Sequence, residues 1–561
     1  MTRAFLVSLS RLAGLVGPLL LSSSMARADD VPADLQRLVL DTGRVEPLAP
    51  EAGLIRLQIH GEEQFRVEGV RSFPLDVTAT VAQRYPNNTV VSDSLGQNYF
   101  ASNWLRITPT LQLGAKLQLV AQGDLTGIVA GQLAHDTFPD QTPGDTINGL
   151  NGYSNVQPRW LYAEWLTPVG LLRAGQQPSH WGMGLVANDG DHPSLFGDYR
   201  YGNIVEQVLF ATKPLGEKSP FVVAVAGNLV YRDNVAILLN GDHAWQGIVA
   251  AFYEQGPDML GVYGVYRHQT HDESSGAYFP YVDTLNVGVV DVAGRFARRV
   301  DVPDQTAFVF GSFEAATELG STDAVRPVGS AAGPWTSIQA YGGAAALGVV
   351  LTSSSSAPKP KDLAKRPDLY GSLVGQIEVG YASGEANPDG TTDKRFTFDP
   401  NHKVGLLLFD EIMRFQTARA SAAAQDAKLI NRPPPGAQWL PSNGGVFGAQ
   451  YVNPTAVVRP RPWLDLKLGA VIAQTTADYV DPYRLAKDSG FFNYNGGDPK
   501  RHDLGVELDG GVEARVPLDF GLRLQLGAQA GLLFAGGALA DASGNAMKTP
   551  WIAVGRAGLQ F

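Results

Sequence analysis

The chain has 561 residues, with 44 Lys and Arg against 55 Asp and Glu, and its formal net charge is −11. An acidic chain lacks the basic footprint that nucleic acids require, so no nucleic-acid partner is expected. The absence of cysteine excludes disulfides, thiolate metal sites and cysteine nucleophiles.

Residues 1–28 have the three regions of a secretory signal peptide. Arg3 and Arg11 give a positive start, "LAGLVGPLLL" is a short apolar core, and Ala26-Arg27-Ala28 is an A-x-A cleavage site. Its removal would leave 41 basic against 55 acidic residues, a net charge of −14. We expect a periplasmic segment at 29–53. No later run of about 18 apolar residues predicts a helical membrane span.

Period-two alternation dominates the rest of the chain. In "LQLGAKLQLVAQGDL", "VELDGGVEARV" and "FGLRLQLGAQAGLLF", apolar residues occupy one parity and mostly polar residues the other. Such alternation predicts strands rather than helices. The 63 Gly, 24 Phe, 19 Tyr and 9 Trp fit half-apolar strands with aromatic girdles. Residues 54–561 are therefore predicted to form an all-β, closed antiparallel transmembrane barrel.

Short turns and long polar connections alternate along the chain, as they do in outer-membrane barrels. Nine long connections, each capping one hairpin, predict eighteen strands with both termini on the periplasmic side. One turn, "SSSSAPKPKDLAKRP" at 353–367, is longer and is interpreted as a disordered turn or a partner-docking segment. The long connections are predicted near 72–97, 130–157, 178–203, 233–244, 272–280, 320–334, 384–443, 477–499 and 535–549.

The last strand, "WIAVGRAGLQF", should pair with a first strand near 54–67, because an open sheet edge cannot lie in hydrocarbon. Phe561 falls on the apolar parity, which we expect to face lipid. A terminal Phe there resembles the assembly signal of bacterial outer-membrane proteins. Outer-membrane lipid and the barrel-assembly machinery are the expected partners.

Two segments resemble known families. "LLRAGQQPSHWGMGLVANDGD" (171–191) and "GYASGEANPDGTTDKRFTFDPNHKVGLLLFDEIM" (380–413) resemble the alginate-export group of porin-like barrels and, more closely, an uncharacterised family of myxobacterial outer-membrane proteins. The resemblance implies an eighteen-stranded barrel with an arginine-rich lumen that passes an anionic polysaccharide. In this chain the predicted lumen carries as many acids as bases, so the alginate substrate does not transfer.

The polar parity of the strands predicts the lumen lining. These charges either tune selectivity or pair across strands in a solvated interior. The predicted pore-lining residues are Arg106, Lys116, Glu164, Arg173, Gln177, Arg267, Glu378, Glu507, Asp509, Glu513, Arg523 and Arg556.

Other candidate chemistry is weaker. His180 with Ser179 and Asn188 suggests a hydrolase, but no nucleophile elbow accompanies them. "ANDGD" (187–191) and "NPDGTTD" (387–393) carry oxygen ligands that suit Ca²⁺, yet both are ordinary turn sequences and neither has a terminal bidentate Glu. No catalytic residue, cofactor or metal site is therefore predicted.

The longest loop, 384–443, contains "DEIMRFQTARASAAAQDAKLINRPPPG", rich in helix formers and stopped by the prolines. A helix of about 20 residues is expected. The apolar run 404–409 before it would be an exposed patch in water. We therefore expect the loop to fold over or into the barrel, with Arg414 and Arg419 facing the permeation path; a mobile extracellular loop is the alternative.

The sequence predicts a channel in the outer membrane of a Gram-negative bacterium, passing small polar solutes or an exported polymer without covalent chemistry. A plugged barrel whose outer loops bind a partner is the alternative, and an outer-membrane hydrolase is the third reading. The sequence does not distinguish a monomer from a trimer.

Overall fold

A computed structural model describes most of the predicted barrel. The described residues are 55–72, 97–131, 155–197, 201–216, 218–255, 258–272, 282–302, 305–323, 335–353, 373–425, 440–461 and 463–561. The expected signal peptide, the segment 29–53 and most of the basic turn 353–367 lie outside the described residues.

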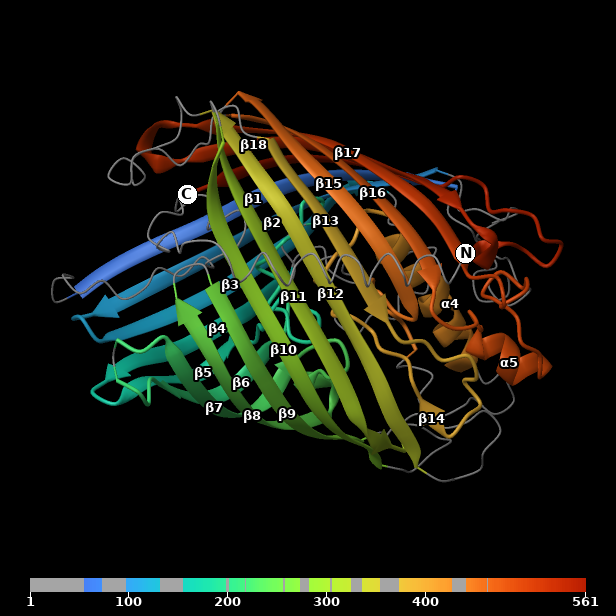
Figure 1. Cartoon of the computed structure of the whole chain (residues 1–561), viewed down its shortest axis with the longest axis horizontal. Helices are drawn as coiled ribbons and strands as arrows, with labels where there is room; N and C mark the ends of the chain where they lie inside the picture. The colour runs from blue at the N-terminus through green and yellow to red at the C-terminus, as the bar shows by residue number, and fades with distance from the viewer. Residues whose placement is uncertain are drawn as a thin grey trace.

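The strands close into one barrel (Figure 1). Strand β1 (Ile55–Arg71) pairs antiparallel with β2 (Gln97–Leu113) on one side and with β19 (Trp551–Gln560) on the other. Of the 19 strands in the described residues, only the two-residue β14 (Thr392–Asp393) lies outside the ring, pairing parallel with β12. The prediction of a closed eighteen-stranded antiparallel barrel is thus confirmed. The other barrel strands are β3 (Leu117–Gly131), β4 (Asn155–Thr167), β5 (Gly170–Pro178), β6 (Ile204–Thr212), β7 (Phe221–Arg232), β8 (Asp242–Gln255), β9 (Asp258–Asp272), β10 (Val282–Val302), β11 (Gln305–Thr322), β12 (Thr336–Ser353), β13 (Leu373–Ala382), β15 (Ala449–Arg461), β16 (Leu464–Thr475), β17 (Asp503–Pro517) and β18 (Arg523–Ala535).

The two ends of the barrel differ in their connections. Residues 114–116 suffice to join β2 to β3, whereas 179–203 join β5 to β6 and 383–448 join β13 to β15. The last of these connections contains a π-helical turn (Leu408–Met413) followed by α4 (Arg414–Gln425). The loop before β17 contains α5 (Pro482–Asp488), and α4, α5 and β14 lie at the same end (Figure 1). None of the described helices is long and apolar enough to cross a bilayer.

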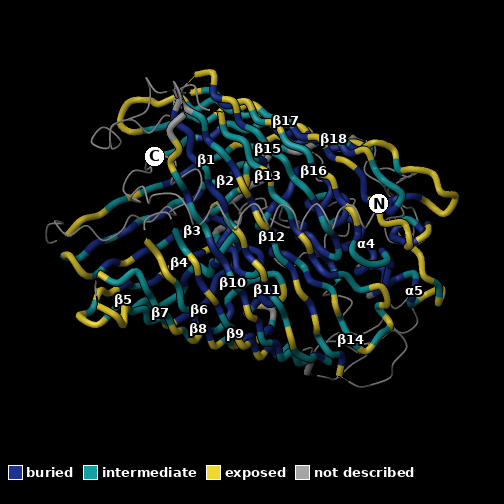
Figure 2. Tube along the Cα trace, viewed as in Figure 1, coloured by how far each residue is buried: buried dark blue, intermediate teal, exposed yellow. Residues whose placement is uncertain are grey.

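The outer face of the barrel is apolar, and the reason is visible in β8. Trp245 and Val249 are 59% and 58% exposed, while Ile248 and Ala250, on the opposite parity, are buried. The same alternation of exposed and buried residues runs along the wall (Figure 2). Monomeric proteins in water rarely expose apolar area of this extent, and it matches the lipid-facing band of a membrane barrel.

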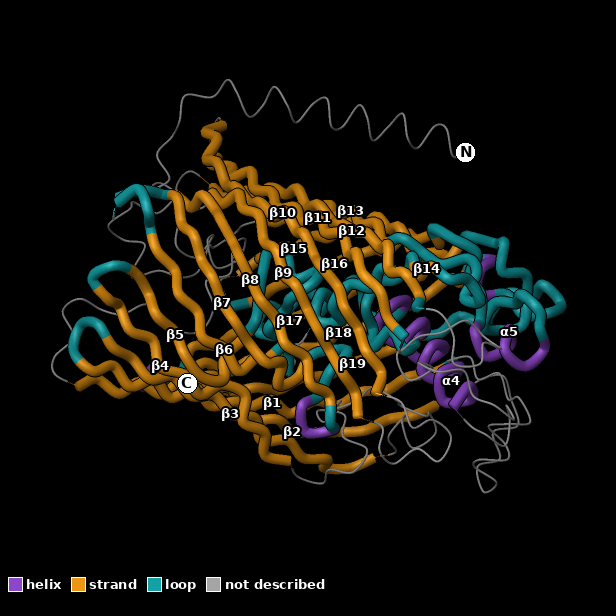
Figure 3. Tube along the Cα trace, turned by 90° about the horizontal axis from the view of Figure 1, so that it is seen from below, coloured by secondary structure: helices purple, strands orange, loops and turns teal. Residues whose placement is uncertain are grey.

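The interior contains a hydrophobic core as well as the polar groups that the alternation predicted. Inward residues of β8 to β12 pack against the loops 179–203 and 383–448. The apolar run 404–409 lies in this core, with residues 406–409 fully buried beside Phe396 and Phe398. Figure 3 shows loop segments running inside the ring of strands. The longest loop therefore folds into the barrel, where its apolar run packs against apolar side chains of the inner wall.

The described part of that loop contains helix as far as residue 425, within the stretch where the sequence suggested a helix of about 20 residues. The α-helical part spans 12 residues and follows a six-residue π-helical turn. The proline stop at 433–435 lies outside the described residues.

Candidate permeation pathway

Two acidic side chains of the barrel wall hold the inward-folded loops by their backbone. The Glu507 carboxylate on β17 accepts hydrogen bonds from the amides of residues 406, 407 and 408, at 2.5, 2.7 and 2.7 Å. Glu314 on β11 accepts from the amides of Met183 and, at 3.0 Å, Leu185. A buried carboxylate needs several donors to offset its lost hydration. These two acids therefore fix the depth at which each loop sits in the lumen.

Residues 181–187, which we call the partition, form a compact turn across the lumen. Trp181 accepts from the amide of Gly184 at 2.9 Å and donates its own amide to Ala187 at 3.0 Å. Its indole nitrogen donates to Asp291 on β10 at 3.1 Å, and its ring stacks on Tyr263 of β9 with centroids 5.2 Å apart. The partition is thus attached to the wall at both its indole and its backbone.

The long loop supports the partition from the other side. The amide of Asp399 donates to the Leu185 carbonyl at 2.7 Å. The His402 ring contacts the Met183 carbonyl through Nδ1 at 3.1 Å and the Glu378 carboxylate through Nε2 at 3.0 Å. Burial alone would lower the pKa of His402, but the Glu378 carboxylate reverses this and raises the pKa above its usual value. The imidazolium form donates in both directions and joins loop, partition and wall.

The partition separates two chambers. The inner chamber, at the end with the short turns, has a volume of about 1430 Å³, and residues 180–183 line it. The outer chamber, towards the long loops, has a volume of about 300 Å³, and residues 185–187 line it. A solute that crosses the barrel along this route must pass the partition.

The inner chamber has a balanced set of charges, seven basic and six acidic side chains. Most are paired: Arg459 with Asp465 at 2.6 Å, and Lys467 with Glu513 at 2.5 Å. Arg556 donates to the Gly197 carbonyl at 3.3 Å. The charged residues that line this chamber are Arg295, Lys403, Arg459, Lys467, Arg515, Arg523, Arg556, Glu62, Asp191, Glu254, Glu378, Asp465 and Glu513.

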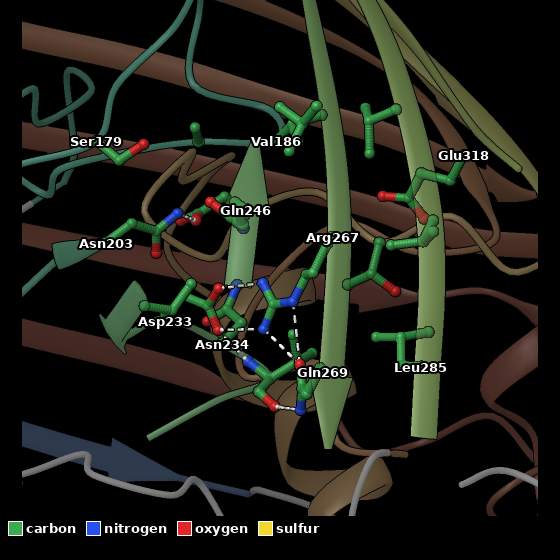
Figure 4. Close-up of a pocket in the computed structure, with 18 of the residues that line it drawn as sticks. Ser179, Val186, Asn203, Asp233, Asn234, Gln246, Arg267, Gln269, Leu285 and Glu318 are labelled. Atoms are coloured by element: carbon green, nitrogen blue, oxygen red, sulfur yellow. Dashed lines mark hydrogen bonds and ion pairs between the residues drawn. The ribbon is translucent and has the colours of Figure 1, made fainter. Parts of the chain in front are cut away.

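The outer chamber is more acidic (Figure 4). Its two basic side chains are Arg267 and Arg395, against the carboxyls of Asp233, Glu318, Asp393 and Asp399. Arg267 is already engaged by Asp233 at 2.5 Å and by the Gln269 amide oxygen at 2.6 Å. Burial raises the pKa of Asp399 to about 7, although hydrogen bonds from Asn401 and Asn203 act in the opposite direction. Because Asp399 is then only partly ionised at neutral pH, the negative excess of this chamber is small.

The structure distributes the twelve predicted lining residues over several environments. Glu378, Glu513, Arg523 and Arg556 line the inner chamber, and Arg267 lines the outer one. The remaining seven line neither of these chambers. Their role in permeation stays a prediction.

Six of those seven residues lie elsewhere in the wall, and one lies in a turn. Arg106, fully buried, binds Asp124 and Asp191. The Arg173 guanidinium pairs with Glu164 at 2.6 Å. Gln177 donates to the Gln207 carbonyl. Glu507 binds the backbone of the long loop, and Asp509 is buried on the same strand, β17. Lys116 lies exposed in the turn between β2 and β3 rather than in the lumen.

The predicted constriction arginines are placed among the loops. Arg419 is buried and donates to the Tyr494 carbonyl at 2.7 Å, and neither Arg414 nor Arg419 lines the two chambers. Other residues from the described part of this loop line the chambers instead. Asp393, Arg395 and Asp399 line the outer chamber, and His402 and Lys403 line the inner one. The proposed contact of Arg414 and Arg419 with solute remains a prediction.

Sequence reasoning missed the groups that position the partition. Glu314 and Asp291 alternate with buried apolar neighbours of the same parity, such as Ala316 and Val289, so their polar parity carried little signal. Arg159 on β4 is fully buried and donates to the carbonyls of Tyr201 and Asp189. A register shift at Gln122 beside it breaks the period-two pattern, which explains the omission.

The three residues that suggested a hydrolase, Ser179, His180 and Asn188, do not come together in one site. Ser179 lines the outer chamber and His180 the inner one. The Asn188 amide is used locally, donating to Gly184 and accepting from Gly190. His180 instead faces Asp189 at 3.8 Å, and burial lowers its pKa to about 4.

No family model and no curated protein matches the chain. Solved structures of similar shape include OccAB1 of Acinetobacter baumannii, at 9% identity and a TM-score of 0.45, covering 92% of this chain and 100% of that one. A BenF-like porin of Pseudomonas fluorescens Pf-5 is 7% identical with a TM-score of 0.44, and the match covers 90% of this chain and 99% of that one. Pseudomonas aeruginosa OpdK with vanillate is 8% identical with a TM-score of 0.43, and the match covers 90% of this chain and 98% of that one. Similarity this distant does not indicate the function of this chain.

Proposed function

We propose that the protein is an outer-membrane channel of a Gram-negative bacterium that passes small polar solutes past a loop-built constriction. The observation that carries the proposal is the pair of chambers on either side of the partition, inside a closed barrel with an apolar outer face. A barrel of this kind is stable only where its outer face meets lipid. The proposed partners are therefore outer-membrane lipid and, during assembly, the barrel-insertion machinery.

The solute class follows from chamber size and charge. The outer chamber, at about 300 Å³, accommodates one small molecule, whereas an exported polymer would require the partition to withdraw. The acidic excess there disfavours a polyanion, so the alginate-like substrate of the resembling family is not proposed. Neutral or cationic polar solutes fit both chambers, because the inner one carries nearly balanced charge.

A plugged, surface-binding barrel is the second candidate, and the hydrophobic contact between loops and wall favours it. Hydrolysis is not proposed, because Ser179 and His180 line different chambers.

Single-channel recording of the full chain in planar bilayers separates these functions. A small, stable conductance with a reversal potential showing modest cation preference is the expected result. If a protein with the heat-modifiable gel mobility of a folded barrel shows no conductance, the plugged, surface-binding barrel would be favoured. A strong anion preference would contradict the charge argument.

A further inference from the structure

The loop between β5 and β6 brings two histidines and one aspartate together beside the partition. His192 Nδ1 lies 2.8 Å from Asp189 Oδ1, and His180 Nδ1 lies 3.8 Å from the same oxygen. One candidate ligand atom from each of the three residues lies within 4.8 Å of the other two. The two imidazole rings stack with centroids 4.1 Å apart.

We propose that His180, Asp189 and His192 bind a divalent transition-metal ion of the zinc class. With metal–ligand bonds of about 2.0–2.2 Å in tetrahedral geometry, ligand atoms lie roughly 3.3 Å apart. The two measured separations, 2.8 and 3.8 Å, fall on either side of that value. Small rotations of the two rings would centre an ion between them. Two imidazoles and one carboxylate are a ligand set that suits zinc-class ions rather than Ca²⁺ or Mg²⁺.

An independent observation at His180 points to a missing ligand. Its Nδ1 is buried and has no hydrogen-bond partner. Buried ring nitrogens in folded proteins are normally satisfied, so an orphaned one calls for an explanation. A metal ion would occupy the position this nitrogen faces.

The carboxylate is held in place before any ion arrives. Asp189 Oδ1 accepts from the amide of Asp191 at 3.0 Å, and the Asp189 carbonyl accepts from the fully buried Arg159 at 2.5 Å. Asp191 is itself paired with Arg106 of the barrel wall. Such supporting contacts orient ligands and strengthen metal binding.

The site opens on the inner chamber, which His180 and His192 both line. A water molecule from that chamber can complete the coordination. The ion would link residue 180 to residues 189 and 192, and so close the segment that contains the partition into a ring. Metal occupancy would therefore stiffen the partition, a consequence that rests on the proposed channel, whereas the binding itself does not.

Cobalt titration of the metal-stripped, tag-free full chain tests the site. We expect one Co²⁺ per chain, with the intense visible bands of four- or five-coordinate cobalt, displaced by one equivalent of Zn²⁺. Asp189→Asn and His192→Ala should each weaken binding by about 100-fold or more, beyond the loss typical of supporting residues. His243→Ala is the matched control, because His243 is exposed on β8. Its affinity should equal that of the wild-type protein.

Failure of the wild-type protein to develop these bands in excess Co²⁺ would overturn the proposal. An equal loss of binding in His243→Ala would do the same. Heat-modifiable gel mobility checks that each variant is folded. If His192→Ala does not fold, the titrations of the wild-type protein and of Asp189→Asn still test the metal site. The metal result does not depend on channel activity, so a silent bilayer recording would leave it unaffected.

Discussion

Replacing Glu507 by Ala should release the long loop from the barrel wall. In the native protein, three consecutive backbone amides, those of residues 406–408, donate to this one carboxylate at 2.5–2.7 Å. Glu507 and the donors at 406, 407 and 408 are all fully buried. Alanine offers no acceptor, so all three donors lose their partner at once.

The size of the effect follows from the number of donors. Each buried donor left without a partner costs about 1–3 kcal/mol, which gives roughly 3–9 kcal/mol for three. Water entering from the inner chamber would recover part of this, so the lower end is the better guide. About 3 kcal/mol shifts the balance between packed and detached loop by roughly 100-fold. Glu507→Gln keeps one carbonyl oxygen and should fall between Ala and wild type.

Single-channel conductance is the readout, with heat-modifiable mobility confirming that the barrel itself is intact. We expect Glu507→Ala to show larger or more frequently fluctuating openings. Glu164→Ala is the matched control, because Glu164 is also a buried acid of the barrel wall but pairs with Arg173 instead of the loop and lines neither chamber. Identical conductance traces for Glu507→Ala and Glu164→Ala would refute the anchoring role.

Four further outcomes are expected. Deleting Phe561 should impair barrel assembly, seen as lost heat-modifiable mobility, because its backbone N–H and carbonyl both hydrogen bond to β1, at 3.0 and 2.9 Å; Gln560→Ala should assemble normally. Excising residues 418–436 should raise conductance severalfold and weaken ion selectivity. An unchanged conductance in a folded variant would contradict the hypothesis that this loop constricts the permeation path. Because burial raises the pKa of Asp399 from 3.8 to about 7, the neutral carboxyl stabilises loop packing fully below about pH 4, and this contribution is lost as pH rises from about 4 to about 7. Conductance should therefore increase between about pH 4 and 7 in the wild-type protein and stay flat in Asp399→Asn. An epitope inserted at Gly390 should be detected on intact cells, and labelling only after permeabilisation would reverse the assigned orientation.

The local sequence was enough to predict the barrel. Alternating residues set the two faces of each strand, and the lengths of the connections set the number of hairpins and the end at which each loop lies. Both are properties of neighbouring residues, because side-chain direction in a strand repeats every two positions. The pairing of "WIAVGRAGLQF" with the first strand followed from the requirement that a sheet in lipid has no free edge.

The composition of the interior was predicted only in part. The apolar run 404–409 correctly indicated a loop that needs cover, because its sequence could not remain in water. Lys116 was assigned to the lumen by parity alone, but it lies in a tight turn where alternation ceases. Arg159 was missed because a register shift changes the parity of its strand.

The partition and its contacts were decided only by the tertiary structure. Glu314 meets Met183 across 131 positions of sequence, and Glu507 meets Leu406 across 101. The same holds for Asp189, which the sequence assigned to an ordinary turn. Only the fold brings the rings of His180 and His192 close to its carboxylate. No local pattern specifies such pairs, because each depends on how far a long loop descends into the barrel, and that depth is set by distant strands closing around it.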